Sequence, residues 1–456
     1  MSKGKSIDKQ NIVLFIGLGL VAISYAFIMM VFRYIDGVSF TAWSVSFWDV
    51  LFSGNGGHDF TYSVGALRGS CHEGVLIEWL TFFPWIIWNF PLWLTHPLSK
   101  NPDVSGMRCV LWSKMFLVVC LVVLCIYVYK ILMRITKNDF TFSLAGVLMV
   151  ASSLEMLDSV AYAGQDEVVY LATFAIALHQ LIAGKKKSGL AFCVITVTLN
   201  PLMIIPIAVI FVTVEKRILK LLVLAAACYL PTFLLSTAYW KLIERQTAQP
   251  IDDMIWTFQS MMNTGTLDTT VGSTSIAVTV LVILVFVVYM QKVKEEELTE
   301  TIIYNVSISF FALNFLTFSI WYRFCMYVPL FVLMIAISKD NRNIKVFMLE
   351  LLFMARFIES LSNFYNLNFD FSSVIGMKIW GEVSGTVVDA TTLMMDNMLY
   401  VLRPIVLACG IILMVICNKR FKKELKFDIP WKTVTYLGAC EGLALCAVVI
   451  TSALKG

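Results

Sequence analysis

The sequence has little charge and few histidines. Of its 456 residues only 14% are charged and four are histidine, whereas 59% are hydrophobic. Soluble globular domains carry about a quarter charged residues, so this composition excludes that class. Long apolar runs separated by short polar segments predict an all-α polytopic membrane protein, with 1–456 as one integral membrane domain. The net charge of +4 is small, and no nucleic-acid partner is expected.

The sequence also lacks a disulfide pattern and a signal-peptide cleavage site. Cys71 and Cys109 are the two cysteines near an aqueous segment, and a bridge between them is left open. No small-residue cleavage site follows the apolar run from Asn11 to Val31, which we interpret as a retained first helix. The other nine cysteines lie in or beside apolar runs and are interpreted as packing residues: Cys120, Cys125, Cys193, Cys228, Cys325, Cys409, Cys417, Cys440 and Cys446.

Basic clusters alternate with acidic or neutral segments and predict the topology. If every cluster is cytoplasmic, the positive-inside rule gives about eleven crossings with the N-terminus inside and the C-terminus outside. The clusters are the N-terminus, 130–137, 185–187, 215–220, 292–294, 339–345 and 418–426. The predicted spans are 11–33, 107–132, 140–157, 168–184, 217–239, 273–290, 302–319, 324–338, 345–362, 396–417 and 433–453.

One apolar segment, 188–213, departs from this alternation because basic clusters flank both of its ends. Asn200-Pro201 and Pro206 interrupt its middle. We predict a broken, re-entrant segment, since irregular backbone at membrane depth is tolerated where it packs in protein or lines a cavity. A single Pro-kinked helix with a misplaced basic loop is the alternative.

The largest predicted outer segment, 34–106, is rich in carboxylates and aromatics. It holds three of the four histidines and six of the twelve tryptophans. The stretch 78–94, "EWLTFFPWIIWNFPLWL", is too broken for a straight span and too apolar for water, so we expect interfacial helices there. His58-Asp59 and His72-Glu73 are metal-ligand types. No helical or finger-type spacing supports a metal site, so none is assigned, although a divalent metal stays open.

Charged side chains at membrane depth cost free energy, so their presence in a predicted span indicates a pairing or a function. Arg356 and Glu359 lie one turn apart in a predicted span and form a pair in the simplest interpretation. Arg323 follows Trp321 and Tyr322 in a short outer turn where positive charge is scarce. A guanidinium is shaped to hold a phosphate through two hydrogen bonds, and Arg403 is a further candidate. For Glu441, alone in the last predicted span, the sequence names no partner.

These features together resemble the GT-C-type membrane glycosyltransferases, including bacterial mannosyltransferase-like proteins. The resemblance lies in "GQDEVVYLATFAIALHQLIAGKKKSGLAFCVITVTLNPLMIIPIAVIFVTVEKRILKLL" (164–222), "FWDVLFSGN" (47–55), "IIWNFPLWL" (86–94) and "SIWYRFCMYVPLFVL" (319–333). Two departures are notable. No residue separates Gln165 from Asp166, and Asn200 stands where a lysine is often found.

The resemblance implies that a sugar passes from a polyprenyl-phosphate carrier to a glycan acceptor on the outer face of the cell membrane, with inversion. The family's catalytic carboxylate matches Asp36 best, with Asp49 and Asp59 in reserve, and a solvated helix end is the plainer explanation of Asp36. The implied phosphate contacts are Arg323, Arg403 and Arg356. The implied sugar and acceptor contacts are Gln165, Asp166, Glu167, Trp321 and Tyr322.

Two other functions are left open. A flippase or transporter of lipid-linked glycans would show broken helices in corresponding positions of two halves, and 188–213 has no counterpart evident in the second half. An O-antigen-type polymerase would use the long outer segments 34–106 and 363–395. Neither the sugar nor the acceptor can be read from the sequence.

Overall fold

The computed structural model describes most of the chain. The described residues are 9–32, 34, 37–38, 40–42, 44–45, 48, 52, 83–95, 106–239, 266–269, 272–316, 325–337, 339–363, 368–370, 384–386, 392–421 and 423–455. They form two compact units. The first combines Met1–Phe32, Cys125–Tyr162 and Tyr327–Gly456, and the second combines Arg33–Leu124 and Ala163–Met326.

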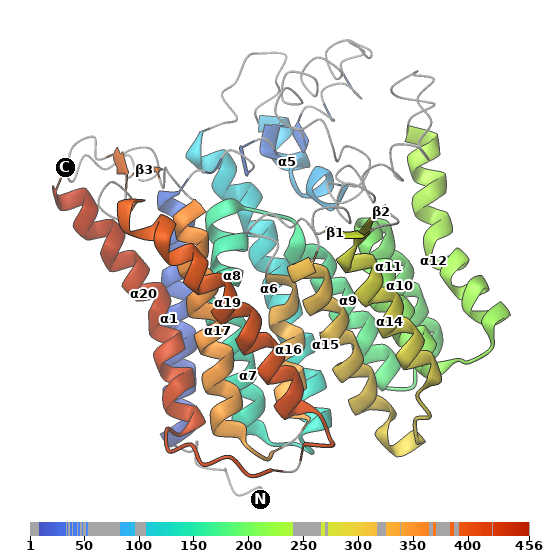
Figure 1. Cartoon of the computed structure of the whole chain (residues 1–456). Helices are drawn as coiled ribbons and strands as arrows, with labels where there is room; N and C mark the ends of the chain where they lie inside the picture. Colours follow the sequence, from blue (N-terminus) through green and yellow to red (C-terminus); the bar gives the residue numbers. More distant parts are fainter. Residues whose placement is uncertain are drawn as a thin grey trace, which may run out of the picture. The chain divides into compact units, whose positions relative to one another are not determined.

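The first unit is a bundle built from the two ends of the chain. Helix α17 packs against α19 and α20, and α1 packs against α7 and α20 (Figure 1). Strands β3 and β4 pair antiparallel, with Phe369 opposite Gly385. The elements are α1 (Lys9–Val31), the last part of α6 (Met107–Ile135), α7 (Phe140–Ser152), α8 (Leu154–Leu157), most of the π-helical turn η2 (Asp158–Ala163), α16 (Val328–Ala336), α17 (Arg342–Asn363), β3 (Asn368–Asp370), β4 (Ser384–Thr386), α19 (Thr392–Cys417) and α20 (Trp431–Lys455).

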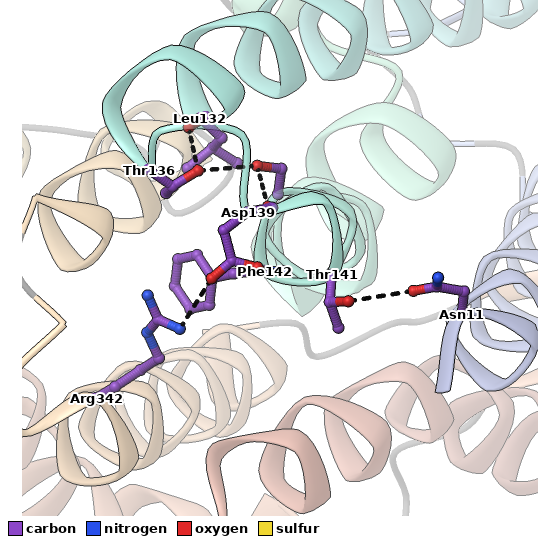
Figure 2. Close-up of polar contacts among 8 residues, drawn as sticks. Asn11, Leu132, Thr136, Asp139, Thr141, Phe142 and Arg342 are labelled. Carbon is purple, nitrogen blue, oxygen red and sulfur yellow. Dashed lines mark hydrogen bonds and ion pairs between the residues drawn. The ribbon is translucent and has the colours of Figure 1, made fainter. Parts of the chain in front are cut away.

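One end of this bundle is held by a polar cluster (Figure 2). Asp139 caps α7 by accepting from the Phe142 N–H at 3.0 Å. The Arg342 guanidinium lies over the Phe142 ring, 3.8 Å from its centroid, and its Nη1 is 3.5 Å from Asp139 Oδ2. Thr141 Oγ1 donates to Asn11 at the start of α1, at 3.3 Å. The starts of α1, α7 and α17 therefore lie together.

The linker before α20 joins the same end. Asn341 donates to the Lys423 carbonyl at 2.9 Å and accepts from the Leu425 N–H at 2.8 Å. Asn343 accepts from the Trp431 N–H at 3.0 Å. Three of the basic clusters used to predict topology, 130–137, 339–345 and 418–426, thus adjoin one end of the first unit.

The second unit packs shorter helices. Helix α9 pairs with α10, and α11 contacts α12, α14 and α15. Ala277 and Leu281 of α14 bury against Ala312 and Leu313 of α15. The elements are α5 (Phe90–Thr95), the first part of α6, α9 (Glu167–Ile182), α10 (Lys186–Leu199), η3 (Pro201–Met203), α11 (Ile204–Val214), α12 (Ile218–Tyr239), the hairpin β1 (Thr266–Thr269) and β2 (Gly272–Ser275), α14 (Ile276–Met290), η5 (Glu295–Glu297) and α15 (Leu298–Leu316).

The predicted break in 188–213 falls where the sequence places it. Asn200 has extended backbone (φ −143°, ψ 109°) between α10 and η3, and its side chain accepts from the Leu202 N–H at 3.0 Å. Pro201 opens the following turn, where its missing N–H does no harm. Pro206 lies inside α11 without ending it. That the segment turns back within a membrane stays a prediction.

The described residues contain far fewer complete spans than the eleven predicted. Three helices are long and apolar enough to cross a membrane alone: Asn11–Val31, Met107–Ile135 and Ile218–Leu235. A fourth crossing results if the pair Phe140–Ser152 and Leu154–Ala163, bent by 50°, counts as one. Other apolar helices are shorter, such as the 15-residue α14, which spans ~22 Å against the ~30 Å of a hydrocarbon core. The expectation of eleven complete crossings is therefore not met by the described residues, although the long apolar helices do indicate a membrane protein.

Candidate functional site

The predicted site residues fall into three groups. Arg356 and Arg403 lie in the first unit, where Arg356 is buried on α17 and Arg403 is exposed on α19. Gln165, Asp166 and Glu167 lie in the second unit. The other six lie outside the described residues, as do His58, His72 and Cys71: Asp36, Asp49, Asp59, Trp321, Tyr322 and Arg323. That these three groups share one site stays a prediction.

The polar stretch before α9 is folded into the second unit. Gln165 is 3% exposed and Glu167 is 1% exposed, while Asp166 is half-buried at the helix start. Gly164 precedes them with φ +69°, a left-handed conformation that glycine adopts without strain. This turn ends the π-helical η2 and redirects the chain into α9. The stretch is thus a buried structural corner with polar side chains, as a binding site requires and a plain surface loop does not.

A lysine that the sequence analysis overlooked lies against this corner. Lys114, in the second turn of α6, is only 1% exposed. Its Cε is 3.1 Å from the position that a Cβ on Gly164 would occupy, and 3.6 Å from the corresponding position on Gly37. The lysine stem therefore runs between two glycines that leave room for it. The available signal was a lysine inside the predicted span 107–132, because ionisable groups at such positions are usually functional.

An aromatic layer from the predicted interfacial segment covers the start of α6. Trp85 donates from Nε1 to the Ser113 carbonyl at 3.1 Å, and Trp88 donates to the Trp112 carbonyl at 2.9 Å. Asn89 donates through Nδ2 to the hydroxyls of Ser44, at 2.6 Å, and Ser113, at 3.1 Å. These bonds fix the 83–95 segment on α6 directly beside Lys114. The expectation of helical structure in 78–94 holds over the residues that the structure describes.

The aromatic layer also contains a buried polar atom for which the described residues provide no hydrogen bond. Asn89 is fully buried, yet its Oδ1 has no hydrogen-bond partner among the described residues. A buried amide oxygen left unsatisfied is unfavourable, so such atoms in native proteins call for a partner such as water or a ligand. We name Lys114, Asn89, Gln165 and Glu167, with Gly37 and Gly164, the α6 polar site. These side chains comprise a cation, two amides and a carboxylate, and that they face one ligand stays a prediction.

No metal site accompanies these residues. Within the described ranges, histidines, cysteines and acidic residues nowhere gather in threes as ligands for a metal ion.

Comparison with protein-family models, with curated proteins and with solved structures finds no match to this chain.

Proposed function

We propose that the protein is a membrane glycosyltransferase that moves a sugar from a polyprenyl-phosphate carrier to a glycan acceptor at the extracytoplasmic face of the cell membrane. The observation that carries the proposal is the burial of Lys114 between Gly37 and Gly164, the glycine that directly precedes Gln165 in the chain. An ammonium group is a common partner for phosphate in proteins. Lys114 offers one near the start of α6, a candidate span.

Each residue of the proposed site has its own role in sugar transfer. Lys114 holds the carrier phosphate, taking the place of the lysine that the resemblance leads one to expect at Asn200. Gln165 and Glu167 bind sugar hydroxyls, which donate to carboxylates and accept from amides. Asp36 directly precedes Gly37 in the sequence and acts as the general base. Asp49 and Asp59 remain its alternatives.

The chemistry is a single displacement. The acceptor oxygen attacks the anomeric carbon while Asp36 takes the hydroxyl proton. The bond between the anomeric carbon and the phosphate oxygen breaks, and both of its electrons leave with polyprenyl phosphate. Lys114 stabilises the negative charge that develops on that leaving group. Arg323, Arg403 and Arg356 stay proposed as further phosphate contacts, with Trp321, Tyr322 and Asp166 beside the sugar and acceptor.

The test uses purified protein in lipid nanodiscs with a panel of radiolabelled polyprenyl-phosphate sugars and added glycan. We expect turnover of one donor in the wild type and its loss in both Lys114→Met and Asp36→Asn. Lys130→Met, farther along the same helix on an exposed position, is the matched control and should retain turnover. Equal turnover by Lys114→Met and the wild type would show that Lys114 does not bind the carrier phosphate.

A lipid-linked glycan transporter is the second candidate, because the structure contains a second broken helix. Alongside the break at Asn200 in the second unit, the first unit bends by 50° at Ser153, between α7 and α8. Broken helices in both units are typical of transporters. The test reconstitutes the protein into liposomes. Movement of labelled carrier across the liposome bilayer, without release of its sugar, would favour this function over sugar transfer.

A further inference from the structure

Three carboxyl groups lie inside the first unit. Glu155 on α8 is 6% exposed, Glu350 on α17 is 8% exposed, and Glu441 on α20 is half-buried. The three helices contact one another. Because α17 and α20 both start at the Arg342–Trp431 end, helical rise places Glu350 ~12 Å and Glu441 ~15 Å from that end. Both carboxyls are therefore well inside the bundle.

The packing around Glu350 leaves its carboxyl directed at a neighbouring helix. A Cβ on Gly438 of α20 would lie 2.7 Å from Glu350 Oε2 and 2.9 Å from Oε1. Only a glycine leaves space for the carboxyl there. Glu155 lies in electrostatic range of Glu441, and Glu350 lies in range of both. The three groups thus form one cluster, which we call the α17 carboxyl cluster.

Each carboxyl in this cluster has an oxygen without a partner. Glu155 Oε1 accepts from the Tyr327 hydroxyl at 2.8 Å. Its Oε2, together with Glu350 Oε1 and Glu441 Oε2, is buried and has no hydrogen-bond partner among the described residues. Buried polar atoms in native structures are normally satisfied. Three open carboxyl oxygens in one interior therefore indicate an occupant that the described protein atoms do not provide.

The surrounding charges do not balance three carboxylates. Arg356, buried on α17, is the described cation whose charge acts on Glu155. Lys345 lies near the start of α17, and the charged or titratable groups that act on it are Cys417, Asp340 and Arg342. Arg403 of α19 is exposed. Two further basic side chains on these helices, Arg342 of α17 and Lys432 of α20, lie at the Arg342–Trp431 end. Other titratable or polar groups on the elements packed against the cluster are Ser24 and Tyr25 of α1, Asp158 of η2, Tyr327 before α16, and Cys446 of α20.

We propose that the α17 carboxyl cluster is a proton-binding site, in which at least one of Glu155, Glu350 and Glu441 carries an exchangeable proton. Three ionised carboxylates facing one guanidinium would leave net negative charge in a low-dielectric interior. A proton removes one negative charge and gives the carboxyl an O–H group. A metal ion is disfavoured because these groups do not converge as a ligand set. The site is independent of the proposed transferase function.

The test is labelling with a hydrophobic carbodiimide, which reacts with protonated carboxyls in apolar surroundings. The carboxyl proton moves to a carbodiimide nitrogen while the carboxyl oxygen bonds to the central carbon. The adduct then rearranges to a stable N-acylurea. The full chain in nanodiscs would be labelled across a pH series, and the modified glutamate located by mass spectrometry. We expect labelling within the cluster that falls as pH rises and that Glu350→Gln or Glu155→Gln reduces at least tenfold.

Two controls separate the outcomes. Glu424→Gln, in the linker before α20, should leave cluster labelling unchanged. The carbonyl stretch of a protonated carboxyl in the infrared should weaken in Glu350→Gln or Glu155→Gln even if carbodiimide cannot reach the site. Absence of both the label and the infrared band at every pH would overturn the proposal. Protection by Na⁺ at constant pH would overturn it in favour of a monovalent-cation site.

Discussion

Glu350 of α17 and Gly438 of α20 are in direct contact, so that a methyl group on the glycine would lie 2.7 Å from the Glu350 Oε2 atom. The contact joins two helices from segments far apart in the sequence. It also explains the glycine at position 438 of α20. The Glu350 carboxyl group occupies the volume that a side chain at this position would need.

Gly438→Ala should therefore destabilise the first unit. Overpacking of this kind costs about 1–3 kcal/mol, and Glu350 is a buried side chain. Unfolding in a detergent titration would measure the change in free energy. Glu350→Ala should rescue much of it in the double variant, and simple additivity of the two changes would contradict the contact. Gly19→Ala, where no atom lies near the added Cβ, is the matched control.

Tyr327→Phe should also weaken the first unit, because it removes the hydroxyl that donates to Glu155 Oε1. Both oxygens of a buried carboxyl would then lack a described donor, which costs about 1–3 kcal/mol. Thermal unfolding monitored by intrinsic fluorescence would measure it. Tyr289→Phe removes a comparable hydroxyl, which donates to the Lys216 carbonyl at 3.0 Å in a partly buried position. A smaller loss in Tyr327→Phe than in this control would be inconsistent with a buried carboxyl partner.

Gly164→Ala should impair the α6 polar site. Its φ of +69° disfavours any residue with a Cβ by about 1–2 kcal/mol, and the added methyl would lie 3.1 Å from Lys114 Cε. We expect lower stability together with weaker binding of polyprenyl phosphate in a nanodisc binding assay. Gly184→Ala has a similar φ of +76° but open space around it. It should lose comparable stability while keeping the binding, and equal loss of binding would refute a local role for Gly164.

The linker between α11 and α12 should loosen at acidic pH. The Glu215 carboxylate accepts the Arg217 and Lys216 N–H groups, each at 3.0 Å, and pairs with Lys220 at 3.3 Å. The hydrogen bond from the Arg217 N–H and the neighbouring Lys220 lower the Glu215 pKa. A lowered folded-state pKa gives a contribution present above the ordinary glutamate pKa and lost as pH falls through the folded value.

Amide hydrogen exchange of the 215–220 segment, corrected for the intrinsic rate at each pH, would follow that loss. The wild type should approach Glu215→Gln in protection as the solution is acidified. Protection in the wild type that stays constant across this range would show that the carboxylate does not hold the linker.

Much of the fold could be predicted because charge marks the ends of apolar helices. The predicted spans 217–239 and 345–362 correspond closely to α12 (Ile218–Tyr239) and α17 (Arg342–Asn363). The break at Asn200 was predictable because proline follows it. The break at Ser153 was not, since neither proline nor glycine marks it. There the Ser153 hydroxyl accepts the Met156 N–H at 3.3 Å and starts a new helix.

The site residues were harder to predict because their meaning depends on distant partners. Lys114 is concealed in an apolar run, and its importance follows only from Gly37 and Gly164, which the fold brings to it. Glu441 had no partner that the sequence could name. Its cluster with Glu155 and Glu350 depends on helix contacts between segments that no local pattern connects.

The pairing of α1 with α20 has a consequence for how the protein is made. Gly442 of α20 fits against Ser24 of α1, where an added Cβ would lie 2.9 Å from the serine Oγ. Helix α1 thus packs against a helix that the ribosome synthesises much later. Until α20 is made, this face of α1 has to be covered by lipid or by an insertion factor. Arrest of translation before α20 would therefore yield a product in which quality-control proteases can recognise the unpaired α1.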